Sequence, residues 1–236
     1  MLKLPIWITN FKHYETSTGQ KGLELAQIHE RVAVETGASI GITPGITDLQ
    51  TIAKSVSIPV IAQHVDGIDY GKHTGRILPQ SVKKAGAVGS LLNHSERRID
   101  PEILQEIICC AQKAGLCRIL CAESPEEVEL FAGYDVDFIA FEPPELIGST
   151  TQSVATAHPE SIAQAAAAAG DIPLLVGAGI NSPEDVKVSL ELGAQGFLVA
   201  TAITKANDPE AALRSFVEVM KITAGRRLQA FHSVQY

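Results

Sequence analysis

The chain alternates eight short apolar runs with helix-like segments from one end to the other. The runs are nearly continuous in apolar residues, as in strands that are buried on both faces of a parallel sheet. They cover residues 5–9, 39–42, 59–62, 88–92, 117–121, 136–141, 173–176 and 196–200. Strands that alternate with helices predict a parallel sheet with right-handed crossovers. Eight such units favour a closed (β/α)8 barrel over an open, doubly wound sheet.

Capping residues followed by proline mark where several of the helices begin. Asp100 precedes proline and glutamate, which is the pattern of an N-cap, a first-turn proline and a favourable acidic residue. Ser124 begins another helix, with Glu127 at the position that completes a capping box. A similar design recurs at Ser182 and at Asp208. These signals support helices between the apolar runs.

Length and composition are those of one barrel domain. The 236 residues fall within the usual size of a single (β/α)8 barrel, and no linker or change of composition divides them. We therefore predict one α/β domain over residues 1–225, followed by a C-terminal tail over residues 226–236. A first helix is expected over residues 22–35, and the last helix is expected to end near Gly225.

Charge and hydropathy exclude several classes of partner. The formal net charge is -8 and no long basic stripe is present, so neither nucleic acid nor an anionic membrane is expected to bind. No signal peptide is visible, and no apolar stretch reaches membrane-spanning length. The four cysteines form no Cys-x-x-Cys pair, which favours reduced thiols and a cytoplasmic location.

Three polar residues of different chemistry follow three of the predicted strands. Lys12 comes after the first strand, His94 after the fourth and Glu142 after the sixth. In a (β/α)8 barrel the carboxyl ends of all strands face one mouth, where active sites are built. Each residue alone has a simpler interpretation, as a surface cation, a structural histidine or a solvated loop carboxylate. The combination at one rim indicates a catalytic site instead.

Small residues gather after the last three predicted strands. Gly148 follows the sixth strand, Gly177 and Gly179 follow the seventh, and Ala200 and Thr201 follow the eighth. Backbone amides in such loops can form an uncharged cradle for an anion, and phosphate often binds after strands seven and eight of a barrel. A glycine after a strand is more often only a tight turn. The position in the barrel keeps both interpretations open.

Three short motifs resemble those of one enzyme family. They are Asn10-Phe11-Lys12, the Ser-Leu-Leu-Asn-His-Ser-Glu-Arg string at residues 90–97, and Ala140-Phe141-Glu142-Pro143. Together, and in this order, they closely resemble the triosephosphate isomerases. The resemblance covers nearly the whole chain and is strongest to the short archaeal branch, which has a similar Glu-Pro-Pro-Glu-Leu-Ile-Gly segment. It implies a TIM barrel and an aldose–ketose isomerase of glycolysis and gluconeogenesis.

The resemblance implies a role for each residue of the motifs. Glu142 would take a proton from carbon as general base, and His94 would act as a neutral donor to the carbonyl oxygen. Lys12 would offset the charge of an enediolate, with Asn10 orienting substrate oxygen. Glu96 would anchor Lys12 through a salt bridge. The reaction needs no metal and no organic cofactor.

A small phosphorylated triose is the implied substrate. Its phosphate would bind to residues in the loops after strands six to eight, namely Ile147, Gly148, Gly177, Gly179, Ala200 and Thr201. The stretch 143–156 would close over it as a lid. Many relatives have a glycine where this chain has Ala202, and alanine is strained there if that position needs a positive φ.

The resemblance also implies a homo-oligomer. The loop after the third strand is long and carries Thr74, which would contact Asn10 of a partner subunit. The short archaeal-type chain favours a tetramer made of two such dimers, although a dimer alone satisfies the Thr74 contact. Two other functions stay open: an isomerase of another small ketose phosphate, such as a four-carbon one, and a non-catalytic barrel that binds a phosphometabolite.

Overall fold

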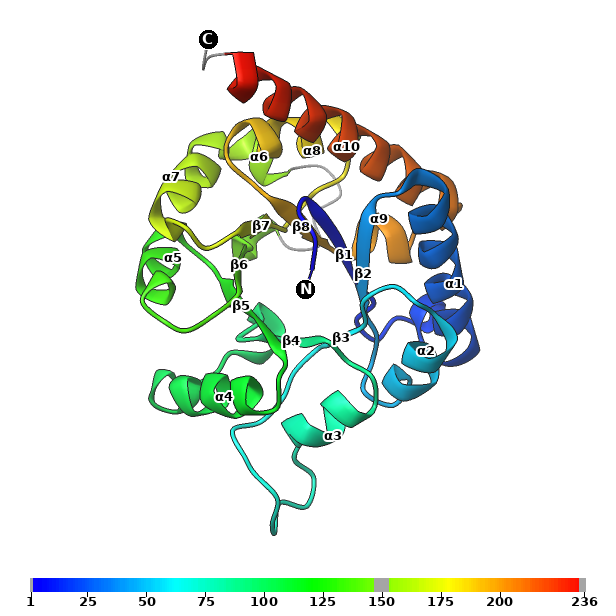
Figure 1. Ribbon diagram of the computed structural model, residues 1–236, viewed down its shortest axis with the longest axis vertical. Coiled ribbons are helices and arrows are strands. Elements are labelled where there is room, and N and C mark those ends of the chain that lie inside the picture. The colour runs from blue at the N-terminus through cyan, green and yellow to red at the C-terminus, as the bar shows by residue number, and fades with distance from the viewer. Residues whose placement is uncertain (1, 147–152, 234–236) are drawn as a thin grey trace.

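Eight parallel strands form a barrel within a ring of helices (Figure 1). The structure is a computed structural model and describes residues 2–146 and 153–233, except for the side chains of residues 145 and 227–233. The strands are β1 (Ile6–Asn10), β2 (Ser39–Thr43), β3 (Ile61–Ala62), β4 (Gly89–Leu92), β5 (Cys117–Ala122), β6 (Phe138–Phe141), β7 (Leu174–Val176) and β8 (Gly196–Val199). Each lies within two residues of a predicted run at both ends. The predicted single-domain (β/α)8 barrel is confirmed.

The order of the strands closes the sheet. Neighbours follow the order β2-β1-β8-β7-β6-β5-β4-β3, and all the pairs are parallel. The two ends of this order meet where Ile42 of β2 forms a parallel bridge with Val60, just before β3. The Ile42 amide donates to the Pro59 carbonyl over 3.0 Å at this seam. All strand carboxyl ends therefore lie on one rim.

Helices connect the strands and surround them. They are α1 (Gly19–Thr36), α2 (Leu49–Ser55), α3 (Pro79–Lys84), α4 (Pro101–Lys113), α5 (Pro125–Ala132), α6 (Val154–Ala157), α7 (Pro159–Ala169), α8 (Pro183–Glu191), α9 (Thr201–Thr204) and α10 (Pro209–Ser233). Three 3-10 turns lie at η1 (Glu15–Ser17), η2 (Ser95–Arg97) and η3 (Pro144–Leu146). None of the helices in the described residues is both long and apolar enough to cross a bilayer.

Alternate residues of the strands serve two separate cores. Ile6 and Ile8 of β1 point into the barrel, where they pack with apolar side chains of β3 to β8. Trp7, between them, points outward and stacks on Phe216 of α10 with ring centroids 5.0 Å apart. The interior is thus filled with side chains, as in other barrels of this type. Only the rims remain for polar chemistry.

The predicted caps are present, with one difference. Asp100 accepts a hydrogen bond from the Glu102 amide, and Ser124 accepts one from the Glu127 amide. In a capping box the Ser124 amide would donate to the Glu127 carboxylate. Here the Glu123 amide donates to that carboxylate instead, over 2.8 Å. The Glu127 carboxylate also accepts a hydrogen bond from Arg98, which lies in the segment after β4. That second partner draws the carboxylate away from the expected position.

The last helix is longer than the sequence indicated. We expected it to end near Gly225, but α10 continues as a helix to Ser233. Figure 1 shows its red end extending past the ring of helices. Glycine disfavours a helix interior by only about 1 kcal/mol, so neighbouring helix formers can override it. The division into a barrel over residues 1–225 and a tail over residues 226–236 stays a prediction.

A buried histidine joins α1 to β1. His29 is fully buried, and its Nδ1 lies 2.7 Å from the Leu25 carbonyl oxygen, which can only accept. Its Nε2 therefore accepts from the Thr9 hydroxyl over 2.8 Å, and that hydroxyl in turn accepts from the Trp7 indole over 3.0 Å. The neutral ring satisfies each of these groups. Burial accordingly lowers the pKa of His29 to about 4.

The lowered pKa of His29 predicts that the stability of the fold depends on pH. The unfolded chain takes up the proton near pH 6.5 and the folded chain only near pH 4, so acid favours unfolding between these values. We expect the free energy of unfolding to fall by about 3 kcal/mol through His29 alone as pH drops from 7 to 4. Denaturant titrations of the natural chain and of His29→Gln, at one protein concentration, measure the difference. Parallel pH curves for the two proteins would contradict it.

Candidate active site

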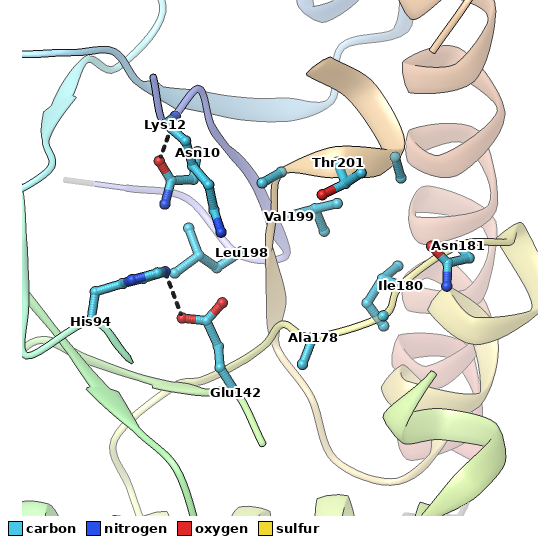
Figure 2. Close-up of a pocket in the computed structure, with 13 residues that line it drawn as sticks. Asn10, Lys12, His94, Glu142, Ala178, Ile180, Asn181, Leu198, Val199 and Thr201 are labelled. Carbon is cyan, nitrogen blue, oxygen red and sulfur yellow. Dashed lines mark hydrogen bonds and ion pairs between the residues drawn. The ribbon is translucent and has the colours of Figure 1, made fainter. Parts of the chain in front are cut away.

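Residues from β1, β4 and β6 meet in one cleft at the carboxyl rim. Figure 2 shows Lys12, His94 and Glu142 pointing toward one another, with Asn10 beside Lys12. Asn10 is the last residue of β1, whereas His94 and Glu142 follow β4 and β6 closely. The cleft is completed by residues of the loops after β7 and β8, which are Ala178, Gly179, Ile180, Asn181, Leu198, Val199, Ala200, Thr201 and Ala202.

A network of amides holds the lysine. Lys12 has a positive φ of 49°, and its amide donates to Asn10 Oδ1 over 3.0 Å. Gln63, which follows β3, donates to the Lys12 carbonyl over 3.1 Å and to the Thr43 carbonyl over 3.2 Å. The Lys12 Nζ lies 2.8 Å from Glu96 Oε1. The lysine is therefore held at its backbone by Asn10 and Gln63 and at its ammonium group by Glu96.

The imidazole of His94 is held in one orientation. Asn93, at a φ of 59°, donates to the Cys121 carbonyl over 3.1 Å and accepts from the Ile99 amide over 2.9 Å. The Glu96 amide donates to His94 Nδ1 over 3.1 Å. Because Nδ1 accepts, the neutral ring carries its proton on Nε2, the nitrogen that faces the cleft. This nitrogen can donate to an oxygen atom in the cleft.

The carboxylate of Glu142 lies on the opposite side of the cleft. Its side chain is 8% exposed, and its Oε2 lies 3.5 Å from His94 Nε2. No residue in the described part of the chain forms a hydrogen bond with Oε2. A Cβ atom at Gly177 would lie 2.7 Å from Glu142 Oε1 and Cγ, so glycine is needed beside the carboxylate.

Burial raises the pKa of the Glu142 carboxyl above its ordinary value of 4.5, and His94 and Lys12 oppose part of this rise. A carboxylate with a raised pKa is a stronger base than one in water. Cys121 is buried next to the carboxyl group, and burial raises the pKa of its thiol as well. The thiol therefore stays protonated at neutral pH.

The loops after β7 and β8 approach the cleft through their backbone. Ala178 and Gly179 both have positive φ, at 61° and 70°. Ala200 precedes the short helix α9, whose first residue is Thr201. Ala202 lies within that helix and does not have a positive φ, so the backbone strain expected at this position is absent. The alanine with a positive φ is Ala178, in the loop after β7.

Other expected residues lie outside the cleft or outside the described residues. Gly177 packs directly against the Glu142 side chain but does not line the cleft. Ile147 and Gly148 lie outside the described residues, as does the central part of the lid expected over residues 143–156. Thr74 is exposed on the loop between β3 and α3, which projects away from the barrel in Figure 1.

The structure adds Gln63 to the residues that build the site. Gln63 lies one residue beyond β3, as a polar residue directly after an apolar run, and this is the signal that singled out Lys12, His94 and Glu142. Among the side chains that the structure describes, no group of three or more from His, Cys, Asp or Glu is placed to hold a metal ion.

Fold and cleft together define a class: a (β/α)8 barrel equipped for acid–base chemistry at its carboxyl rim. A family model described as "Triosephosphate isomerase" matches residues 5–223. A triosephosphate isomerase of Metallosphaera sedula is 45% identical, over 92% of this chain and 96% of its own. One of Methanobacterium bryantii is 44% identical, over 90% of this chain and 96% of its own.

The chain belongs to the triosephosphate isomerase family, a family of isomerases. The resemblance seen in its motifs, including the likeness to archaeal members, is confirmed. A crystal structure of triosephosphate isomerase from Bartonella henselae matches with a TM-score of 0.69 at 21% identity, covering 90% of this chain and 98% of that one. At this identity the match supports the fold.

The raised pKa of Glu142 predicts the acid limb of the pH profile. A base in the cleft works only when it is ionised, and burial makes Glu142 take up its proton at a higher pH than a free glutamate. We expect kcat/KM to decline as pH decreases, with a midpoint above 4.5. Initial rates at low substrate concentration in overlapping buffers measure it. A midpoint at or below 4.5 would contradict the effect of burial.

Proposed function

We propose that this chain interconverts dihydroxyacetone phosphate and D-glyceraldehyde 3-phosphate through an enediolate, with Glu142 as the base. The observation that carries this proposal is the arrangement of Glu142 and His94. A buried carboxylate oxygen, which accepts no hydrogen bond from the described residues, lies 3.5 Å from the imidazole nitrogen that carries the proton. One group can remove a proton from carbon while the other donates to the neighbouring oxygen.

The remaining residues stabilise the charge that forms. Proton removal from carbon places negative charge on the substrate oxygens. Lys12 and the His94 Nε2–H face that position, and their geometry is fixed before the reaction by Glu96 and Asn10. Donors that are already oriented need no reorganisation in the transition state. Asn10 further orients a substrate oxygen in this proposal.

The phosphate of the substrate is assigned to the loops after β7 and β8. Gly179, Ala200 and Thr201 line the cleft, and Figure 2 shows Thr201 on the side away from His94. Backbone amides in such loops attract an anion although the chain as a whole carries a charge of -8. Ile147 and Gly148 complete the phosphate site in the prediction made from the sequence.

A comparison of substrates tests the proposal. We expect rapid conversion of glyceraldehyde 3-phosphate and far slower conversion of a four-carbon ketose phosphate. Glu142→Gln keeps the shape of the side chain but removes the base, so turnover should fall by about three orders of magnitude or more. A coupled spectrophotometric assay measures both results.

Each alternative has its own outcome in this assay and in a titration with inorganic phosphate. Preference for the four-carbon substrate would assign the chain to another ketose phosphate. Phosphate binding without isomerisation would indicate a binding protein. If Glu142→Gln kept more than about a tenth of the activity, the role of Glu142 as base would be wrong. Inorganic phosphate binding by the variant serves as the control for its folding.

The proposal includes a homo-oligomer in which Thr74 meets Asn10 of a partner subunit. A second cleft borders the active site and is lined in part by Asn10, Lys12, His64 and Arg97. The exposed loop that carries Thr74 is held at its base by Asp66, a buried residue that accepts from Arg76 and from the Ile77 amide.

A projecting loop with a fixed base and an open cleft beside the active site support a dimer, and two such dimers would form the tetramer that we favour. The free state of all four cysteines is consistent with the cytoplasmic location that belongs to the same proposal.

A bulky charge on the loop should separate the subunits. We expect the natural chain to elute at two or four times its mass of 25.1 kDa, and Thr74→Arg to shift toward the monomer with at least about ten-fold lower activity. Size-exclusion chromatography with light scattering at micromolar concentration measures the mass. Ser215→Arg, at an exposed position of α10, is the matched control. A fully active monomer would exclude the role of Thr74.

A further inference from the structure

A buried carboxylate lies behind the loop that faces the cleft from β7. Asp185, in the first turn of α8, is 4% exposed and does not line the cleft. Its Oδ2 accepts from the Asn181 amide over 3.0 Å, from the Ser182 amide over 2.8 Å and from the Ser182 hydroxyl over 2.8 Å. Ser182 and Asp185 form a complete capping box. The end of the loop is thereby fixed to the helix.

The other oxygen of this carboxylate reaches a different segment. Asp185 Oδ1 accepts from the Ser153 hydroxyl over 2.5 Å, and Ser153 is 3% exposed at the N-cap of α6. The Val154 amide donates to the Ala178 carbonyl over 3.5 Å, which joins the same two segments again. One carboxylate thus ties the start of α6, the loop after β7 and the start of α8 together.

Helix capping alone does not account for this arrangement. A capping box needs only one bond from the side chain at the third position back to the N-cap amide. Asp185 has three further donors, from Asn181, from the Ser182 hydroxyl and from Ser153. None of these three donors belongs to α8 itself, and Asn181 and Ser153 lie beyond its N-cap residue, so the carboxylate acts on the shape of the loop.

The loop needs such support because its backbone is strained. Ala178 has a φ of 61°, in the left-handed region that an L-residue with a side chain rarely adopts. The Gly177 amide fixes the start of the loop by donating to the Phe141 carbonyl over 2.9 Å. Asp185 fixes its end. The strained conformation persists because both ends are held.

We propose that Asp185 is the positioning residue of the phosphate site, acting through residues 177–181. Its carboxylate holds the loop in the conformation that directs backbone amides toward the phosphate of a phosphorylated triose, and Ser153 joins the same network. This inference rests on the proposed function, because the loop is assigned to phosphate there. Donors fixed in advance bind an anion better than donors that must first be ordered.

Two substrates separate this role from a general loss of structure. In Asp185→Ala, we expect kcat/KM for glyceraldehyde 3-phosphate to fall about ten-fold or more, mainly through KM. The low activity toward unphosphorylated glyceraldehyde should change less than about two-fold, because that substrate does not use the loop. The dissociation constant of inorganic phosphate, measured by 31P NMR, should rise in parallel with KM. Asp185→Asn keeps an acceptor for Asn181 and should recover much of the loss.

Further variants make the test independent of folding. Ser153→Ala removes one hydrogen bond to Asp185 and should weaken phosphate binding by about three-fold even if Asp185→Ala does not fold. Asp208→Ala removes the exposed aspartate that accepts from the Ala211 amide at α10, and should leave the ratio of the two substrates unchanged.

Equal losses for both substrates, or unchanged phosphate affinity in Asp185→Ala and Ser153→Ala, would overturn the inference. Absence of isomerase activity in the natural chain would instead overturn the proposed function, because the phosphate titration measures the loop by itself.

Discussion

Closure of the parallel sheet is the constraint on which the rest of the structure depends. Once Ile42 pairs with Val60, every strand has two neighbours and every strand ends on the same rim. Apolar side chains such as Ile8 and Leu198 fill the interior, so polar groups can gather only where the strands end. The same closure that buries the core therefore brings residues that lie far apart in the sequence into one cleft.

Burial of Glu142 makes its carboxylate more basic and the folded chain less stable at neutral pH. The folded-state pKa of Glu142 is raised above 4.5, so the folded chain binds its proton more tightly than the unfolded chain does. Stability is therefore lost as pH rises through the window between 4.5 and the raised value. At neutral pH the ionised carboxylate costs stability, and the same lack of solvation makes it a better base. His94 and Lys12 offset part of this cost, so the cleft tolerates the charge.

The sequence was sufficient to predict the barrel and the residues that meet at its rim, because both depend on local periodicity and on strand ends. It was insufficient where a residue far away in the sequence determines which hydrogen bonds a side chain forms. The Glu127 carboxylate turns to Arg98 and to the Glu123 amide, which no local capping rule includes. For α8 the sequence indicated only a cap at Ser182, and the hydrogen bond that Asp185 accepts from Ser153 joins residues more than thirty positions apart. Such contacts depend on how the helices pack.

Backbone strain in this chain is concentrated at the cleft. Among the described residues, the non-glycine residues with positive φ are Lys12, Asn93 and Ala178, and each lies one or two residues beyond its strand. Propensity alone would place glycine at such positions. Here hydrogen bonds replace that freedom: Asn10 and Gln63 hold Lys12, and the Asn93 side chain holds its own loop. For Ala178 the holding groups lie on other elements: the Val154 amide donates to the Ala178 carbonyl, and Asp185 accepts from the Asn181 amide at the end of the loop. Asp185 thus holds one loop of the cleft, as Asn10 and Gln63 hold another.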